Sequence, residues 1–105
     1  MVHQVALYKL RPGVGDDLLE EIIRRTRSLL LKVPEVMAVR SGRNLDPAAE
    51  WPFYVGLDFE SRAKQRIFMD DGAWHKFQHD VVHRYTANHL IFEYELDPGR
   101  NVRYS

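Results

Sequence analysis

This chain of 105 residues lacks cysteine, net charge and any long apolar run. The absence of cysteine excludes disulfides and thiolate chemistry. Its 15 basic residues balance 15 acidic ones, which argues against nucleic-acid binding, because that function needs a basic surplus to neutralise phosphates. No apolar run approaches the roughly 18 residues of a membrane span, and MVHQVALYKL lacks the pattern of a signal peptide. We therefore expect a cytoplasmic protein with neither nucleic acid nor membrane as a partner.

The composition is that of one compact domain over residues 1–105. Hydrophobic residues make up 45% of the chain, and its length suits a single core. No repeat, low-complexity tract or linker divides the chain. Residues 97–105, which end in RNVRYS, are polar, and we expect them to form a C-terminal tail.

Hydrophobic periodicity predicts both strands and helices. Alternation predicts four strands: Val2–Leu10, Val36–Arg43, Phe53–Phe59 and Asn88–Leu96. Helical spacing predicts three helical segments: Asp17–Val33 capped by Asp16, Ser61–Met69 capped by Ser61, and Ala73 to about Thr86. This order predicts an α+β, ferredoxin-like βαββαβ fold, a four-stranded antiparallel sheet with its helices on one face.

The other face of this sheet has no predicted cover. The strands carry apolar residues on both faces, so a bare face would expose a large apolar patch. A second copy related by a two-fold axis is the simplest cover. We therefore predict a homodimer whose sheets face each other and enclose an apolar space.

A succession of segments also resembles a known family. The segments are VHQVALYKLRPGV, VPEVMAVRSGRN, LDFES, WHKF and HLIFEYEL. At these spacings they resemble the stress-responsive A/B barrel domain, called Dabb, over about Val2 to Leu96. The resemblance implies a dimeric α+β barrel. Many members of the family have no assigned reaction, whereas others are polyketide cyclases, such as olivetolic acid cyclase of plant cannabinoid synthesis, or hydroxynitrile lyases.

The resemblance further implies site residues. His75 matches a histidine that acts with a tyrosine in the cyclase, and His3 matches a first-strand histidine. The tyrosine position is Met69 here, and a further cyclase histidine corresponds to Phe53. The segment Asp71–His75 is one residue longer than the usual Asp-Pro-Ala-His stretch and lacks its proline. The family thus implies His75 as the proton carrier and His3 as its polar support, without their tyrosine partner.

His75, His79 and His83 are spaced i, i+4, i+8, which predicts one face of a helix. Histidine titrates near neutral pH and often ligates metals. Eight helical residues rise by roughly 12 Å, so one ion cannot bind all three. No acidic residue stands at the spacing of a known metal motif. We therefore predict no metal and no other cofactor, with acid/base chemistry at His75. The alternative is a histidine at a helix start that is satisfied by backbone or water.

An apolar pocket with a few polar groups is the usual form of a small-molecule site. We assign His3 and His89 to the strand faces that carry Val5, Leu7, Val55 and Ile91. The predicted ligand-binding residues are Val5, Leu7, Phe53, Val55, Trp74, His79, His89 and Ile91. Two locations stay open, between the facing sheets or between sheet and helices. His3 and His89 are equally well interpreted as strand-end histidines that contact water or the other subunit, and Arg40 either holds an acidic ligand group or forms an intersubunit ion pair.

These observations predict a small homodimer that binds a small apolar or aromatic ligand. Whether it is an enzyme stays open. If it is one, we expect proton-transfer chemistry of the cyclase, lyase or isomerase type. The alternatives are a non-catalytic, stress-associated binding or assembly protein and a dimeric-barrel monooxygenase.

Overall fold

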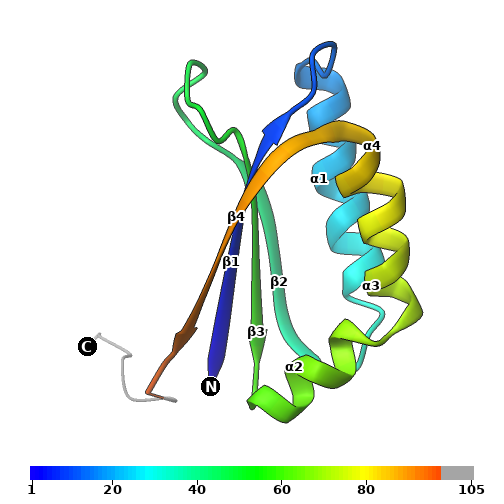
Figure 1. The fold of residues 1–105 in the computed structure, drawn as a ribbon, viewed down its shortest axis with the longest axis vertical. Coiled ribbons are helices and arrows are strands. Elements are labelled where there is room, and N and C mark those ends of the chain that lie inside the picture. Colours follow the sequence, from blue (N-terminus) through cyan, green and yellow to red (C-terminus); the bar gives the residue numbers. More distant parts are fainter. Residues whose placement is uncertain (98–105) are drawn as a thin grey trace.

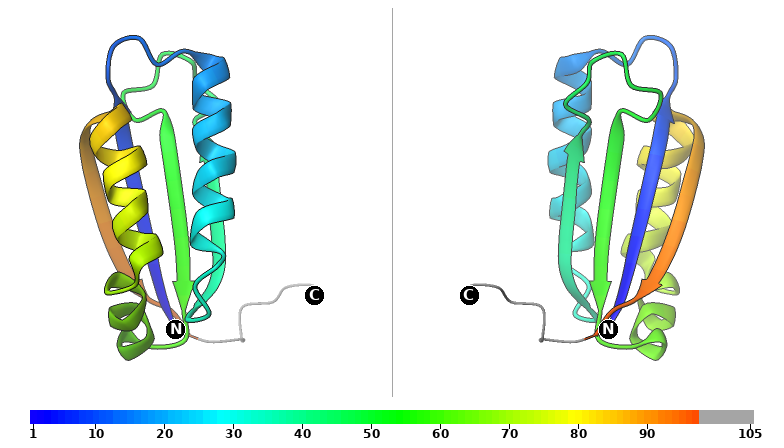
Figure 2. Two further views of the ribbon diagram at one scale, coloured as in Figure 1. Left: turned by 90° about the vertical axis from the view of Figure 1, so that its right-hand side faces the viewer. Right: turned by 90° about the vertical axis from the view of Figure 1, so that its left-hand side faces the viewer.

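The computed structural model describes residues 1–97, so most of the predicted tail at 97–105 lies outside the described residues. The elements are β1 (Val2–Leu10), α1 (Asp16–Leu30), β2 (Val36–Arg43), β3 (Phe53–Phe59), α2 (Arg62–Met69), α3 (Gly72–Phe77), the π-helix η1 (Gln78–Val82), α4 (His83–Tyr85) and β4 (Thr86–Glu95). The four strands form one antiparallel sheet in the order β2-β3-β1-β4. The helices cover one face of this sheet (Figures 1 and 2). This confirms the predicted ferredoxin-like fold with its helices on one face.

The first helix differs from its prediction at both ends. Gly15 is the N-cap and Asp16 already belongs to the helix, so the predicted cap at Asp16 is wrong. The helix ends at Leu30 rather than Val33, and the Val33 amide donates to the Leu30 carbonyl in a tighter turn. Pro34 disfavours the helical conformation of Val33 before it, which explains the early end.

The last helical segment is broken by a π-helix. We predicted one helix from Ala73 to about Thr86, but residues 78–82 form η1, and β4 already begins at Thr86. A π-turn holds more residues than an α-turn, so the histidine spacing no longer marks a single face. Side chains cap the two helices before η1. The Ser61 hydroxyl accepts from the Lys64 amide at the start of α2, as predicted, and the Asp71 carboxylate accepts from the Ala73 amide at the start of α3.

The core fills the space between the sheet and the helices. Its largest side chains are aromatic and at most 1% exposed: Tyr8, Phe53, Phe59, Phe68 and Phe77. Trp74 joins them, with its ring centroid 5.4 Å from that of Phe68 and 5.5 Å from that of Phe77. Trp74, which we predicted to bind a ligand, is therefore part of the core.

The opposite face of the sheet is open (Figure 2). Leu90, Phe92 and Tyr94 of β4 lie there and are 40%, 42% and 53% exposed, and the neighbouring residues of β1, Val5 and Leu7, are half-buried. The predicted bare apolar face is thus present. In the described part of the chain, no helix has the length and apolar character needed to cross a bilayer.

Candidate functional site

Two cavities lie at the two ends of β4, and we call the exposed strip between them on its helix-facing side, from His89 to Glu93, the groove. His89, Ile91 and Glu93 pair in register with Tyr8, Ala6 and Gln4 of β1, whose side chains lie in the buried layer beneath the helices. Residues that are directly opposite in a sheet share a face. Yet Ile91 is 46% exposed, and His89 and Glu93 are exposed as well. The helical arm from α3 to α4 therefore leaves the helix side of β4 uncovered.

The upper end of this groove is a cavity of about 320 Å³. It is lined by Arg11, Gln78, Val82, His83, Thr86, Ala87, Asn88 and His89. The Arg11 guanidinium donates to the His83 carbonyl from Nη2 and Nε, at 3.1 and 3.3 Å, and its backbone N–H donates to the Tyr85 carbonyl at 2.8 Å. These bonds tie the end of the arm to the end of β1. The volume lies at the lower end of the range of small-molecule sites.

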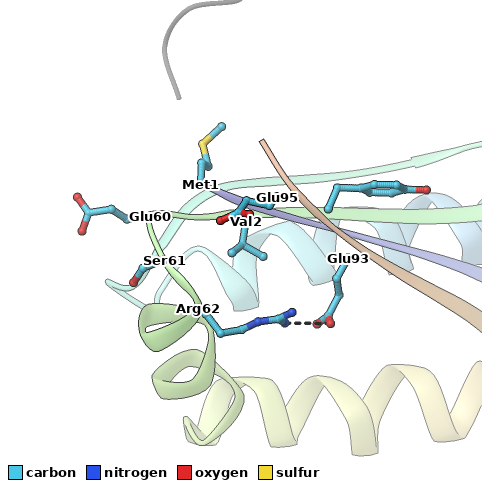
Figure 3. Close-up of a pocket in the computed structure, with 8 residues that line it drawn as sticks. Met1, Val2, Glu60, Ser61, Arg62, Glu93 and Glu95 are labelled. Carbon is cyan, nitrogen blue, oxygen red and sulfur yellow. Dashed lines mark hydrogen bonds and ion pairs between the residues drawn. The ribbon is translucent and has the colours of Figure 1, made fainter. Parts of the chain in front are cut away.

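The lower end of the groove holds a hydrogen-bonded polar network. Gln65 Nε2 lies 2.7 Å from Gln4 Oε1 and 2.7 Å from Glu93 Oε2, and both glutamines are almost fully buried. Arg62 Nη1 donates to Glu93 Oε1 and to Gln65 Oε1, each at 2.9 Å. Figure 3 shows Arg62 and Glu93 in the adjacent cavity of about 420 Å³. This network fixes a carboxylate beside the apolar Ile91 wall.

The hydrogen bond from Arg62 lowers the pKa of Glu93 below its usual value of 4.5, and the bond from Gln65 adds to this, while partial burial opposes both. Because folding lowers the pKa of Glu93, its ionised carboxylate stabilises the folded protein fully at a pH above 4.5. This stabilisation is lost as the pH falls through the lowered pKa of the folded state.

We expect Arg62→Met to raise the pKa of Glu93, measured by NMR of its carboxyl carbon, and to cost at most about 1 kcal/mol at neutral pH because the pair is partly exposed. Arg66→Met, an exposed arginine of the same helix, should leave that titration unchanged. An unshifted Glu93 titration in Arg62→Met would contradict the assignment.

His75 is exposed in α3. It precedes Gln78, which lines the cavity, by three residues, but His75 is not itself among the lining residues. The His79 side chain is 87% exposed and its Nδ1 lies 2.9 Å from Asp80 Oδ1. That hydrogen bond lowers the pKa of Asp80. Within residues 1–97, no three histidine or acidic side chains converge as a metal site would require.

The predicted pocket residues are divided by the sheet. His3, Val5 and Leu7 lie on the open face, whereas His89 and Ile91 lie on the helix side. Phe53 and Val55 are 0% and 2% exposed in the core. The assignment of these residues to one shared wall is therefore wrong. Val55 pairs with Ala6, and the side chains of Ala6 and His3 point to opposite faces of β1, so Val55 and His3 lie on opposite faces of the sheet. Their roles in binding stay predictions.

Four further polar residues escaped the sequence analysis as site residues: Gln4, Asp58, Gln65 and Glu93. The signal for Glu93 was present, since it alternates with Phe92 and Tyr94 on a strand whose two faces are both partly apolar. Asp58 likewise interrupts the otherwise apolar end of β3. On the open face, the His3 Nδ1 atom lies 2.5 Å from Asp58 Oδ1, and Arg40 Nη1 lies 3.0 Å from Asp58 Oδ2. His3 and His75 are therefore on opposite faces of the sheet and do not share a site within one subunit.

Neither a protein-family model nor a curated protein matches this sequence. Solved structures do match. A Dabb family protein with a ferredoxin-like fold from Mesorhizobium loti is 14% identical, with a TM-score of 0.79 over 90% of this chain and 95% of the other. A dimeric ferredoxin-like protein of unknown function from Thermobifida fusca is 20% identical, with a TM-score of 0.79 over 90% of each chain. Hydroxynitrile lyase from Passiflora edulis is 16% identical, with a TM-score of 0.78 over 92% and 94%. This chain therefore has the ferredoxin-like fold found in a solved Dabb family protein.

Proposed function

We propose that this chain is a homodimeric Dabb family protein that binds a small apolar or aromatic ligand in the groove along β4. The observation that carries the proposal is the exposure of Ile91, at 46%, on the side of the sheet that the helices otherwise bury. His89 lies above this apolar wall and the Glu93 network lies below it. An apolar middle with polar ends suits a flat ring system that carries oxygen groups.

The dimer is supported by the open face. Leu90 and Phe92 form an exposed apolar edge there, and a second copy would remove it from water. The Thermobifida fusca relative is described as dimeric, which is consistent with the same use of this face. The groove lies on the other side of the sheet, so dimerisation leaves it open to a ligand.

If the protein is an enzyme, His75 is its proton carrier and the reaction needs no cofactor. A positioned histidine accelerates proton transfer by roughly 10²–10⁴-fold. The lyase from Passiflora edulis makes cleavage of hydroxynitriles a reaction worth testing. In an active protein, His75→Ala should abolish turnover and leave ligand affinity within about twofold, because His75 would act on the barrier rather than on the groove wall.

A non-catalytic binding protein is the second candidate, and one observation favours it. Among the described residues, no hydrogen bond orients the His75 ring, and Met69 stands where the cyclase has a tyrosine. A general base is normally oriented by a third group. Full ligand binding without turnover of hydroxynitrile or polyketide substrates would decide for this candidate. The monooxygenase alternative stays a prediction.

The groove itself can be tested with an uncharged fluorescent probe, N-phenyl-1-naphthylamine. We expect Ile91→Asp to weaken probe binding by about tenfold or more, because it places a charge in the apolar wall. Ile67→Asp is the matched control, since Ile67 is similarly exposed, at 51%, but lies on α2 and not on β4. Equal binding by Ile91→Asp and the wild type would remove the groove as the ligand site.

A further inference from the structure

Asp58 joins two basic side chains on the open face of the sheet. His3 stands directly opposite Asp58 in the β1–β3 register, and its Nδ1 lies 2.5 Å from Asp58 Oδ1. Arg40 reaches the second oxygen from β2, at 3.0 Å. The Asp58 side chain is only 11% exposed, so little water competes with these bonds. Three strands thus hold one carboxylate and fix the histidine beside it.

This pairing determines which ring nitrogen of His3 is free. A neutral histidine carries one N–H and one lone pair. Since Asp58 accepts at Oδ1, the proton resides on Nδ1 and the lone pair on Nε2. The Arg40 guanidinium donates to the other oxygen in a charge-assisted hydrogen bond. The same division of roles, with a carboxylate that orients a basic imidazole, operates in enzymes that use histidine as a general base.

The surroundings of His3 are suited to an aromatic molecule. Tyr94 lies directly across from His3 on β4 and is 53% exposed, and Val5 follows on the same face of β1. On the other side, Gly56 separates Tyr54 from Asp58 along β3. A Cβ at position 56 would collide with the Tyr54 hydroxyl, so glycine allows that hydroxyl to lie over the strand. The polar cluster therefore has a phenolic hydroxyl on one side and apolar surface on the other.

We propose that His3, Asp58 and Arg40 form a second small-molecule site, separate from the groove, for a weakly acidic hydroxyl on an aromatic or conjugated ring. The ligand hydroxyl gives its proton to Nε2 of His3, and the same proton returns from Nε2 when the ligand leaves. The negative charge on the ligand oxygen is stabilised by the free N–H groups of Arg40, whose side chain is 58% exposed. The ring packs against Tyr94 and Val5.

Only the covering of this site by a second copy rests on the proposed dimer. The proton transfer to His3 needs residues of one subunit alone. The apolar residues that a second copy would cover, Leu90 and Phe92, lie on the edge strand β4. The cluster lies on β1, β3 and β2, toward the other edge. A contact centred on β4 therefore leaves the cluster facing the space between the two sheets.

Titration with 4-nitrophenol tests the site, because its phenol and phenolate forms absorb at different wavelengths. At a pH just below that at which the free probe ionises, we expect the wild type to give saturable binding with a phenolate spectrum. His3→Asn keeps a donor for Asp58 but has no basic nitrogen, and it should weaken binding by about tenfold or more, as should Arg40→Gln. Ile91→Asp disrupts the groove but lies on the opposite side of the sheet from His3, so it should bind this probe like the wild type. Light scattering on the same samples reports the oligomeric state.

Two results would overturn the site. One is equal binding and an equal phenolate signal in His3→Asn and the wild type. The other is loss of binding in Ile91→Asp but not in His3→Asn, which would place the phenol in the groove and leave the proposed function standing. A protein that is monomeric yet binds the phenol through His3 would support this site and contradict the proposed dimer.

Discussion

Phe92→Asp should convert the proposed dimer into monomers and raise its dissociation constant by about a hundredfold or more, because an unpaired carboxylate at a buried contact costs several kcal/mol. Phe92 lies at the middle of the exposed edge of β4, between Leu90 and Tyr94 on the same face. Its ring is 42% exposed in a single subunit, which is unfavourable unless a partner covers it. Sedimentation over a range of protein concentrations measures the constant directly.

Leu45→Asp is the matched control for this experiment. Leu45 is 97% exposed in the loop between β2 and β3, outside the strands of the sheet. We expect the control to dimerise like the wild type. A wild-type protein that is monomeric, or a Phe92→Asp variant that stays dimeric, would show that the open face is not the subunit contact.

The same variant separates the two sites. The groove along β4 is built within one subunit, from β4 and the helical arm, so monomers of Phe92→Asp should still bind the uncharged probe. In the proposed dimer the His3 cluster faces the space between the two sheets, so its ligand should bind more weakly once that space is open to water. Binding at the two sites should therefore respond differently to one substitution.

The sequence predicted the first three strands with their observed bounds, because a period of two runs along them, whereas the fourth begins at Thr86 rather than at Asn88. It also placed His3 and Val5 on one face, because these residues share a strand. It could not show whether Val55 of β3 lies on the same face of the sheet as His3 of β1, because this depends on the register in which the two strands pair. His3 pairs with Asp58 and Ala6 with Val55, and only the register reveals this.

The helical arm eluded prediction for a different reason. Residues 73–86 contain no proline or glycine, so no local signal marks the π-helix at Gln78–Val82. Within this stretch the side chains of Trp74, Phe77 and Val81 are buried, and we infer that their packing against the sheet decides the turn geometry. The contribution of α2 to the groove, through Gln65 and Arg62, likewise depends on tertiary packing rather than on spacing.

Phe77→Ala should lower the free energy of unfolding by about 3–5 kcal/mol, through the lost burial of the ring and the cavity left behind. Phe77 is 0% exposed. It belongs to a series of rings that links α3 to the sheet, in which Trp74 contacts Phe68 and Phe68 contacts Phe59 at a centroid distance of 5.0 Å. Urea unfolding at a fixed protein concentration measures the loss, because subunit association also contributes to the midpoint.

The effect is large because Phe77 is one of the three buried residues of the arm, with Trp74 and Val81. α3 has six residues. His75 and Lys76, which precede Phe77 in this helix, are exposed and add little packing. A loss of this size is a large part of the roughly 5–15 kcal/mol that holds a small domain together. Phe77→Leu, which keeps most of the volume, should cost less than about 1.5 kcal/mol, and Lys76→Ala should stay within about 0.5 kcal/mol. A loss below about 1 kcal/mol in Phe77→Ala would mean that the arm, and with it the groove wall at Gln78 and Val82, is anchored elsewhere.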